Sequence, residues 1–265
     1  MKDVVITDCA CVAEDGFGNR RTWQSWDGAA PGADDLRWSM FSETPFDAFR
    51  RLDALCRYAL SAVELLTLPP PAAGGRRPDL GLCLGTQYGS LDADIAFIRT
   101  ANNASGPSPR LFTYTLPSTA LGEIAIRHRI TGPNLCVLCG PDSGMAALRE
   151  GTFMVADGTV AGCVCLGCDA VSMPVAGRSV GYAYAFVLER APAACEREGP
   201  LARLIPGDAG CTPARCVAAH DALPALFRYV ASSARPAGEP PCESLCLRAA
   251  AHPAAPCLLC NLDAG

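Results

Sequence analysis

The sequence predicts an α/β protein in which a sheet is covered by helices on both faces. Short apolar runs alternate with longer amphipathic runs from residue 3 to residue 190, and this alternation is typical of layered α/β folds. Half of the 265 residues are hydrophobic, which is enough for one substantial core. After residue 190 the composition shifts towards Ala, Pro, Arg and Cys. We therefore expect two parts, residues 1–190 and residues 191–265, with the second packed on the first.

Strands are expected where apolar residues alternate with polar ones or form short continuous runs. The expected strands are residues 3–13, 79–90, 135–139, 160–171, 180–190 and 256–262. The run 79–90 is expected to enter a turn that contains glycine.

Helices are expected where apolar residues recur at helical spacing. The clearest spans residues 42–66, with Thr44 as its N-cap and Pro45 at its first position. The other expected helices are residues 91–101, 115–129, 143–158 and 222–234. Irregular loops are expected at residues 16–40 and 102–109, where Gly, Asp, Asn and Pro are frequent.

Charge and hydropathy exclude several classes of partner. The chain has 22 basic and 27 acidic residues and scattered arginines, so no nucleic-acid interface is expected. It contains no run of 18 apolar residues, and its first ten residues are too short an apolar run for a signal peptide. We expect no membrane span and a cytoplasmic location. The sixteen cysteines are then expected to be reduced thiols.

The stretch CVLCGPDSGM, residues 136–145, allows three interpretations: half of a zinc site, a turn that presents a nucleophile, or the shell of such a site without its nucleophile. Zinc is favoured only by Cys-x-x-Cys spacing. In a strand, residues i and i+3 face opposite sides, so paired cysteines there are expected to be core thiols and no metal site is expected. The pairs are Cys136 with Cys139, Cys165 with Cys168, and Cys257 with Cys260.

A strand, a tight turn and a helix in this order suit acyl-transfer chemistry. The N–H groups and the dipole at a helix N-terminus stabilise a thiolate and an oxyanion. At this turn, Asp142 is expected to cap the helix that follows. Cys139 is expected to be a buried thiol at the end of the strand.

The segment TGPNLCVLCGPDSGMAAL, residues 131–148, resembles the active-site segment of β-ketoacyl synthases of the thiolase fold. Four further segments resemble the same family in order: LGLCLGTQYGSLD, SPRLFTYTLPSTALGEIAIRHRITGPN, GTVAGCVCLGCDAV and GYAYAFVLER. The resemblance covers about residues 78–191. It implies a thiolase-like fold, layered as helix–sheet–helix, with a ketosynthase N-terminal half and a truncated second half.

One departure from the family concerns the nucleophile. The resemblance places Pro141 at the position of the catalytic cysteine, and proline has no nucleophilic group. The family's two catalytic histidines have no counterpart, because His220 and His252 lack the flanking motifs. The chain is therefore expected to have no catalytic residue. The shell of the vestigial site would be formed by Cys139, Asp142, Ser143 and Gly144.

The sequence is most similar to short chain-length factors of the kind found in aryl-polyene and xanthomonadin-type pigment clusters. That resemblance implies a non-catalytic subunit without a cofactor, which forms a heterodimer with a full-length ketosynthase and meets acyl carrier protein through the complex. It also implies that strand 135–139 pairs across the dimer axis and that Leu111 or Phe112 blocks the acyl tunnel. The implied interface and tunnel residues are Leu111, Phe112, Thr115, Leu135 and Val137.

Two alternatives remain open from the sequence. One is a stand-alone acyltransferase or decarboxylase that acts through Cys139 or Asp142. The other is a homodimeric acyl-binding scaffold that pairs through the same strand.

Overall fold

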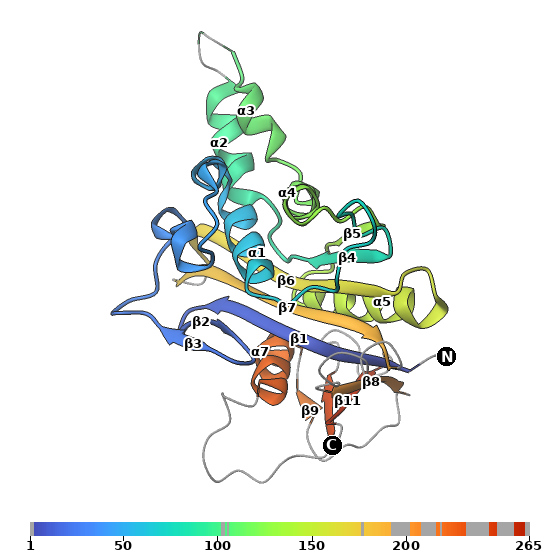
Figure 1. The fold of residues 1–265 in the computed structure, drawn as a ribbon. Coiled ribbons are helices and arrows are strands. Elements are labelled where there is room, and N and C mark those ends of the chain that lie inside the picture. The colour runs from blue at the N-terminus through green and yellow to red at the C-terminus, as the bar shows by residue number, and fades with distance from the viewer. Residues whose placement is uncertain are drawn as a thin grey trace.

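The fold is built on one mixed sheet of eleven strands with the order β5-β4-β6-β7-β1-β8-β11-β10-β9, and β2 and β3 branch from β1 (Figure 1). The computed structural model describes residues 3–101, 104, 106–175, 178–191, 202–207, 216–217, 219–231, 244–247 and 257–262. The strands are β1 (Val4–Ala13), β2 (Gly16–Asn19), β3 (Trp23–Ser25), β4 (Leu80–Gly85), β5 (Asn134–Val137), β6 (Gly162–Val175), β7 (Arg178–Arg190), β8 (Ala202–Gly207), β9 (Cys216–Val217), β10 (Ser244–Leu247) and β11 (Cys257–Leu262).

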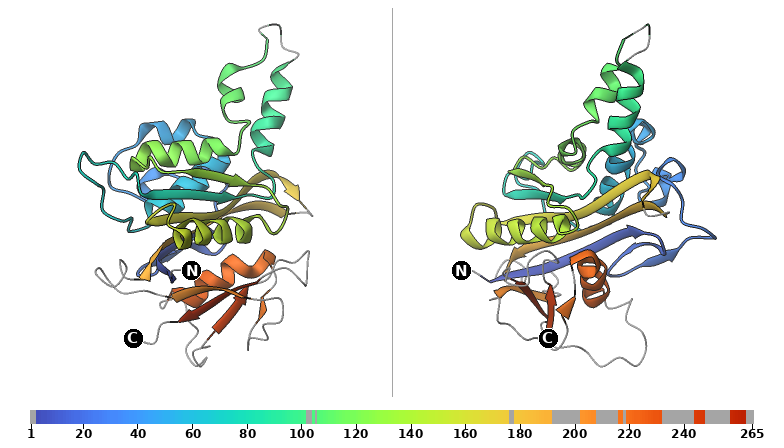
Figure 2. Two further views of the ribbon diagram at one scale, coloured as in Figure 1. Left: turned by 90° about the vertical axis from the view of Figure 1, so that its right-hand side faces the viewer. Right: turned by 180° about the vertical axis from the view of Figure 1, so that it is seen from behind.

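Helices cover both faces of this sheet, so the predicted helix–sheet–helix layering is confirmed (Figure 2). The helices are α1 (Ala54–Glu64), α2 (Leu91–Ala101), α3 (Pro109–Thr113), α4 (Ser118–His128), α5 (Ser143–Asp157) and α7 (Ala219–Val230). α1 and α4 pack on one face, and α5 and α7 pack on the other. None of the described helices is long and apolar enough to cross a bilayer.

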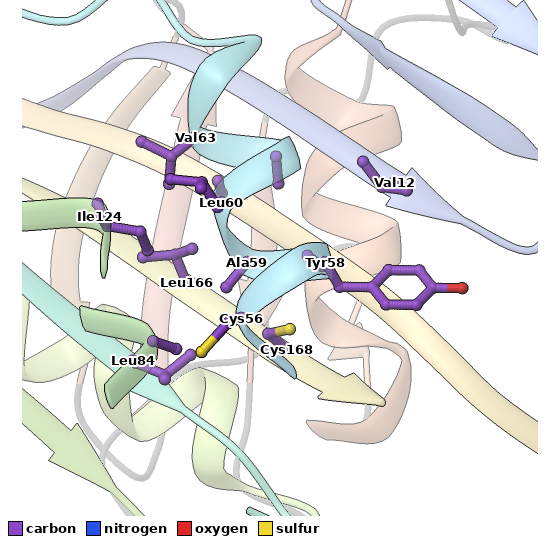
Figure 3. Packing of buried hydrophobic residues seen from close by; sticks show 14 of the residues in the cluster. Val12, Cys56, Tyr58, Ala59, Leu60, Val63, Leu84, Ile124, Leu166 and Cys168 are labelled. Atoms are coloured by element: carbon purple, nitrogen blue, oxygen red, sulfur yellow. The ribbon is translucent and has the colours of Figure 1, made fainter. Parts of the chain in front are cut away.

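The alternation of side chains along each strand separates two hydrophobic clusters. On β6, Val164 and Leu166 face α1 and α4, whereas Cys163 and Cys165 face α5. We call these the α1-side cluster and the α5-side cluster. Figure 3 shows part of the α1-side cluster, where side chains of α1 lie over Leu166 and its neighbours. Burial of both faces explains why the strands are almost continuously apolar.

β4 is parallel to both of its neighbours, β5 and β6. β7 runs antiparallel to β6 and to β1, and β8 pairs with the other edge of β1. The ends of β4 and β5 and the middle of β6 therefore lie together, because Gly85 is in register with both Val137 and Gly167. α5 begins at this point.

The first helix is shorter than expected. The run 42–66 contains a 3-10 helix, Asp47–Arg51, and then α1 from Ala54. Asp53 is the N-cap and accepts a hydrogen bond from the Cys56 amide at 2.9 Å, so the prediction of Thr44 as the cap was wrong. Leu52 has extended backbone angles and separates the two helices.

Residues 16–40 are more regular than expected. β2 and β3 extend the sheet from β1, and three-residue 3-10 helices lie at Ala33–Asp35 and Trp38–Met40. Trp26 Nε1 donates a hydrogen bond to the Ala13 carbonyl at 2.8 Å, and its ring lies 4.8 Å from that of Phe17. These long-range contacts order a segment whose composition alone is typical of a loop.

α2 and α3 form a projection away from the sheet (Figures 1 and 2). α3 was not predicted, although Ser108 caps it by accepting from the Leu111 amide and Pro109 occupies its first turn. The expected loop at 102–109 includes residues 102, 103 and 105, which lie outside the described residues. The predictions of α2, α4, α5, α7 and of all six strands are confirmed within a few residues.

Candidate functional site

The candidate site lies where β4 and β5 end and α5 begins. An ideal Cβ on Gly85 would lie 2.0 Å from the Ser143 carbonyl oxygen. Only glycine at this position lets the N-terminus of α5 approach the end of β4 so closely. The sequence thus positions the first turn of α5 through a residue that has no side chain.

The carboxylate of Asp169 fixes the turn that follows β4. One of its oxygens accepts from Thr86 Oγ1 at 2.6 Å and from the amides of Gln87 and Tyr88 at 2.9 Å each. The other accepts from the Tyr182 hydroxyl at 2.7 Å. Burial, together with the charge of Asp169, raises the pKa of Tyr182, so this hydroxyl remains a donor.

The turn before α5 is closed by Ser143. Its hydroxyl accepts from the Cys139 amide at 2.8 Å and donates to the Gly140 carbonyl at 2.7 Å. Gly140 has a φ of 64°, which glycine adopts without strain. Pro141 is exposed on this turn, at the position that the resemblance gives to the nucleophile.

Two expectations about this turn were wrong. Asp142 is at the N-cap position of α5, but its side chain makes no capping hydrogen bond. Asp142 has helical backbone angles. A capping side chain reaches the N2 or N3 amide from an extended backbone, so Asp142 does not cap the helix. Cys139 is exposed and not buried, because β5 ends at Val137 and the chain has already turned outward.

A cleft of about 1050 Å³ opens beside this turn. Pro141 and Gly144 line it, together with Tyr58, Tyr182 and Tyr184. The cleft is of the size that small-molecule sites usually have.

Leu223 of α7 enters this cleft from the second part of the chain. An ideal Cβ on Gly144 would lie 2.5 Å from Leu223 Cδ1, and one on Gly167 would lie 2.0 Å from the same atom. The leucine side chain thus lies between the two glycines, next to the place where a nucleophile would act. No local sequence pattern indicates this contact, because it joins residues far apart in the chain.

The five residues expected at an interface or tunnel lie on α3, β5 and their flanks. Phe112 is 60% exposed and its ring lies 5.5 Å from that of Phe97. Leu111, Thr115 and Val137 are half-buried, and Leu135 is exposed. β5 is the edge strand, and within the described part of the chain it pairs only with β4.

Other exposed apolar side chains lie near these residues and were not predicted. Leu138 is 56% exposed and Leu116 is 61% exposed. Leu138 and Pro117 both lie beside Gly89, so the turn after β5 is next to the start of α4. We call Leu116, Leu135 and Leu138 the β5-edge surface.

The histidines do not assemble at this site in the part of the chain that is described. His128 is largely buried on α4, with its Nε2 3.5 Å from Glu64 Oε2. The side chain of His220 and all of His252 lie outside the described residues.

The Cys-x-x-Cys pairs do not form a common ligand set where their side chains are described. Cys165 belongs to the α5-side cluster and Cys168 to the α1-side cluster, as expected for a strand. A different group meets instead: the Sγ atoms of Cys83, Cys163 and Cys165 all lie within 4.8 Å of one another. Sequence spacing within one strand could not reveal this group, because Cys83 comes from β4.

Comparison with known proteins relates this fold to solved structures. No protein-family model and no curated protein matches the chain. The ishigamide ketosynthase/chain length factor matches with a TM-score of 0.67 and 18% identity over 98% of this chain and 99% of that chain. The ketosynthase ApeO in complex with its chain length factor ApeC, from Xenorhabdus doucetiae, matches with a TM-score of 0.60 and 15% identity over 97% and 98%.

A third structure contains a ketosynthase, AntDE, bound to the type II polyketide acyl carrier protein AntF. It matches with a TM-score of 0.67 and 13% identity over 98% of this chain and 99% of that chain. The alignments cover almost all of both chains in each case. The chain therefore has the thiolase-like fold of ketosynthases and chain length factors.

Proposed function

We propose that this chain is a non-catalytic chain-length factor that pairs with an active ketosynthase and shapes its acyl tunnel. The observation that carries the proposal is Pro141. The surrounding frame is intact, with the close approach at Gly85, the Asp169-anchored turn and the Ser143-closed turn. Proline at the tip of this frame supplies no group that forms an acyl-enzyme.

The β5-edge surface supports a partner of the same fold. An exposed edge strand offers unpaired backbone groups and invites pairing with another chain. Here the strand carries the exposed side chain of Leu135 and is followed by that of Leu138. The solved neighbours include a ketosynthase in complex with its chain length factor. We infer that β5 pairs across a heterodimer axis and that acyl carrier protein is met through this complex.

We infer a biosynthetic pathway for this chain and its partner ketosynthase. The pathway would be of the aryl-polyene type, within polyketide and fatty-acid-like chemistry, because the sequence motifs resemble the short chain-length factors of such clusters. We infer that this chain needs no cofactor of its own for this role.

Co-expression with a full-length ketosynthase from the same organism tests the proposal. A 1:1 heterodimer is expected, and acyl groups should be found covalently bound only to the ketosynthase. Leu138→Glu should abolish the heterodimer, since it places a charge in the apolar interface. Met40→Glu is the matched control, because Met40 is also an exposed apolar residue and lies on the 3-10 helix Trp38–Met40, outside the β5-edge surface. A purified chain that condenses malonyl units alone would refute the proposal.

The exposed thiol of Cys139 favours a second candidate, an acyltransferase that uses this residue. Its sulfur is accessible on the same turn as Pro141. Incubation with an acyl thioester, followed by intact mass measurement, separates the two candidates. Stoichiometric acylation that is lost in Cys139→Ser would support the acyltransferase, whereas a chain-length factor remains unmodified.

A homodimeric scaffold is the remaining alternative. It would give a stable homodimer through β5 that does not exchange for the ketosynthase. Size-exclusion chromatography with light scattering, on the chain alone and then mixed with the ketosynthase, distinguishes the two assemblies.

A further inference from the structure

Three thiols meet in the core beneath α5. Cys83 lies on β4, and Cys163 and Cys165 lie on the neighbouring strand β6, all on the face covered by α5. Cys163 Sγ is 3.7 Å from Cys83 Sγ and 3.8 Å from Cys165 Sγ. The third pair lies within 4.8 Å.

These distances suit a single metal ion bound to three sulfurs. A point equidistant from the three Sγ atoms lies about 2.1–2.4 Å from each, and metal–thiolate bonds are about 2.3 Å long. No backbone movement is needed to bring the three sulfurs to that distance. Two adjacent parallel strands hold all three, so the arrangement is rigid.

The surroundings supply a further sulfur, and α5 packs closely on the three thiols. Met154 Sδ lies 3.7 Å from Cys83 Sγ. Gly151 of α5 faces the three sulfurs, since an ideal Cβ on it would lie 2.1 Å from Cys165 Sγ. α5 thus approaches the sulfurs through a glycine and places a thioether beside them one turn later.

We propose that Cys83, Cys163 and Cys165 bind one soft, thiophilic metal cation, and that Cu(I) is the ion that fits best. Thiolate and thioether ligands together select soft ions such as Cu(I). Zinc usually takes four ligands from Cys, His and carboxylates, and the described residues offer only the Met154 thioether as a fourth. The site would join β4 to β6 beneath α5. It does not depend on the proposed role as a chain-length factor.

Copper titration of the full-length chain tests this site. The titrated protein is the Cys139→Ser variant, because the exposed thiol of Cys139 would bind copper adventitiously. Cu(I) is added anaerobically against bicinchoninate as a competing chelator. One tightly bound Cu(I) per chain is expected, and X-ray absorption should show a shell of sulfur only at about 2.3 Å.

Matched cysteine variants locate the ion. Cys83→Ala and Cys163→Ala should weaken binding about 100-fold, and Met154→Leu, which conserves volume, about tenfold. Cys168→Ala is the control, because its buried thiol lies on the same strand but in the α1-side cluster. Circular dichroism confirms that each variant is folded, and Met154→Leu serves as the test if an alanine variant is not.

Three results would overturn the proposal. One is equal copper binding by Cys83→Ala and Cys168→Ala. Another is a metal shell that contains nitrogen or oxygen, and the third is retention of Zn(II) in competition with Cu(I). In each case the three sulfurs are core thiols and nothing more.

Discussion

The imidazole of His128 is buried beside a carboxylate, yet it is held neutral. Burial lowers its pKa to about 4 and outweighs the opposing charge of Glu64 at 3.5 Å, and the charges of Arg127 and Arg77 lower the pKa further. The unfolded chain binds a proton near the ordinary value of 6.5, whereas the folded chain does so only near 4. The free energy of unfolding should therefore fall by up to about 3 kcal/mol as the pH drops through this window.

The variant His128→Gln isolates this effect. Denaturant unfolding of parent and variant at pH 7 and at pH 4.5 gives the difference between them. The parent should lose more stability than the variant on acidification. Equal losses would show that the histidine is protonated as easily in the folded chain as in the unfolded one.

Asp169 is a buried acceptor, and its loss should destabilise the fold. Its carboxylate accepts four hydrogen bonds and is 2% exposed. Asp169→Asn places an amide N–H against a donor and should cost about 2–3 kcal/mol of unfolding free energy, because a buried charged acceptor is lost. Tyr182→Phe removes one donor only and should cost about 1 kcal/mol. Denaturant unfolding of both variants checks that Asp169→Asn costs more than Tyr182→Phe. A larger loss in Tyr182→Phe would show that the tyrosine contributes more to stability than the carboxylate.

At the scale of the element, α1 depends on the cap that the sequence prediction missed. Asp53 is the residue whose side chain bonds the Cys56 amide. Asp53→Ala should lower the free energy of unfolding by about 1 kcal/mol, and Asp53→Ser should retain most of it. Thr44→Ala should have no measurable effect, since Thr44 lies outside the helix. Thermal denaturation of the three variants decides which residue begins the helix.

The α3 element carries the proposed control of product length. Phe112 points away from its own core, with 60% of its surface exposed. In the heterodimer, Phe112→Ala should lengthen the acyl product, because it removes the volume that blocks the tunnel. Phe153→Ala, on α5, is the control and should leave the product unchanged. Mass spectrometry of carrier-bound products reads the length, and an unchanged distribution in Phe112→Ala would place the stop elsewhere.

At the scale of the molecule, the two parts share one sheet through β1 and β8 and one cluster through α5 and α7. We predict that the chain unfolds in a single transition. Leu226 is fully buried on α7. Leu226→Ala should lower the free energy of unfolding of the whole chain by about 2–5 kcal/mol. Tryptophan fluorescence and far-ultraviolet circular dichroism should give coincident curves. Two separate transitions would show that residues 191–265 fold independently.

The sequence predicted most elements because each carries its own local signal. The alternation on β6 assigned Cys165 and Cys168 to opposite faces, and Gly158 ended α5 in the left-handed conformation. The position of Pro141 followed from the order of the motifs. The errors have two physical causes. Some are local, such as the β1–β2 hairpin at Ala13 and Gly16 and the outward turn that exposes Cys139, where weak local signals left more than one conformation possible. The approach of Leu223 to Gly144 is different, because it joins segments far apart in the chain.

The position of β1 between β7 and β8 has a consequence for synthesis of the chain. Val4 pairs with Arg190 on one side and with Leu204 on the other. At about 5–20 residues per second, roughly ten to forty seconds separate the emergence of this first strand from that of β7 and β8. During that interval only Ala10–Ala13 can pair, with β2, and the apolar residues Val4 to Ile6 lack both of their neighbouring strands. We therefore expect a nascent chain to gain from shielding of its first strand until β7 and β8 are made.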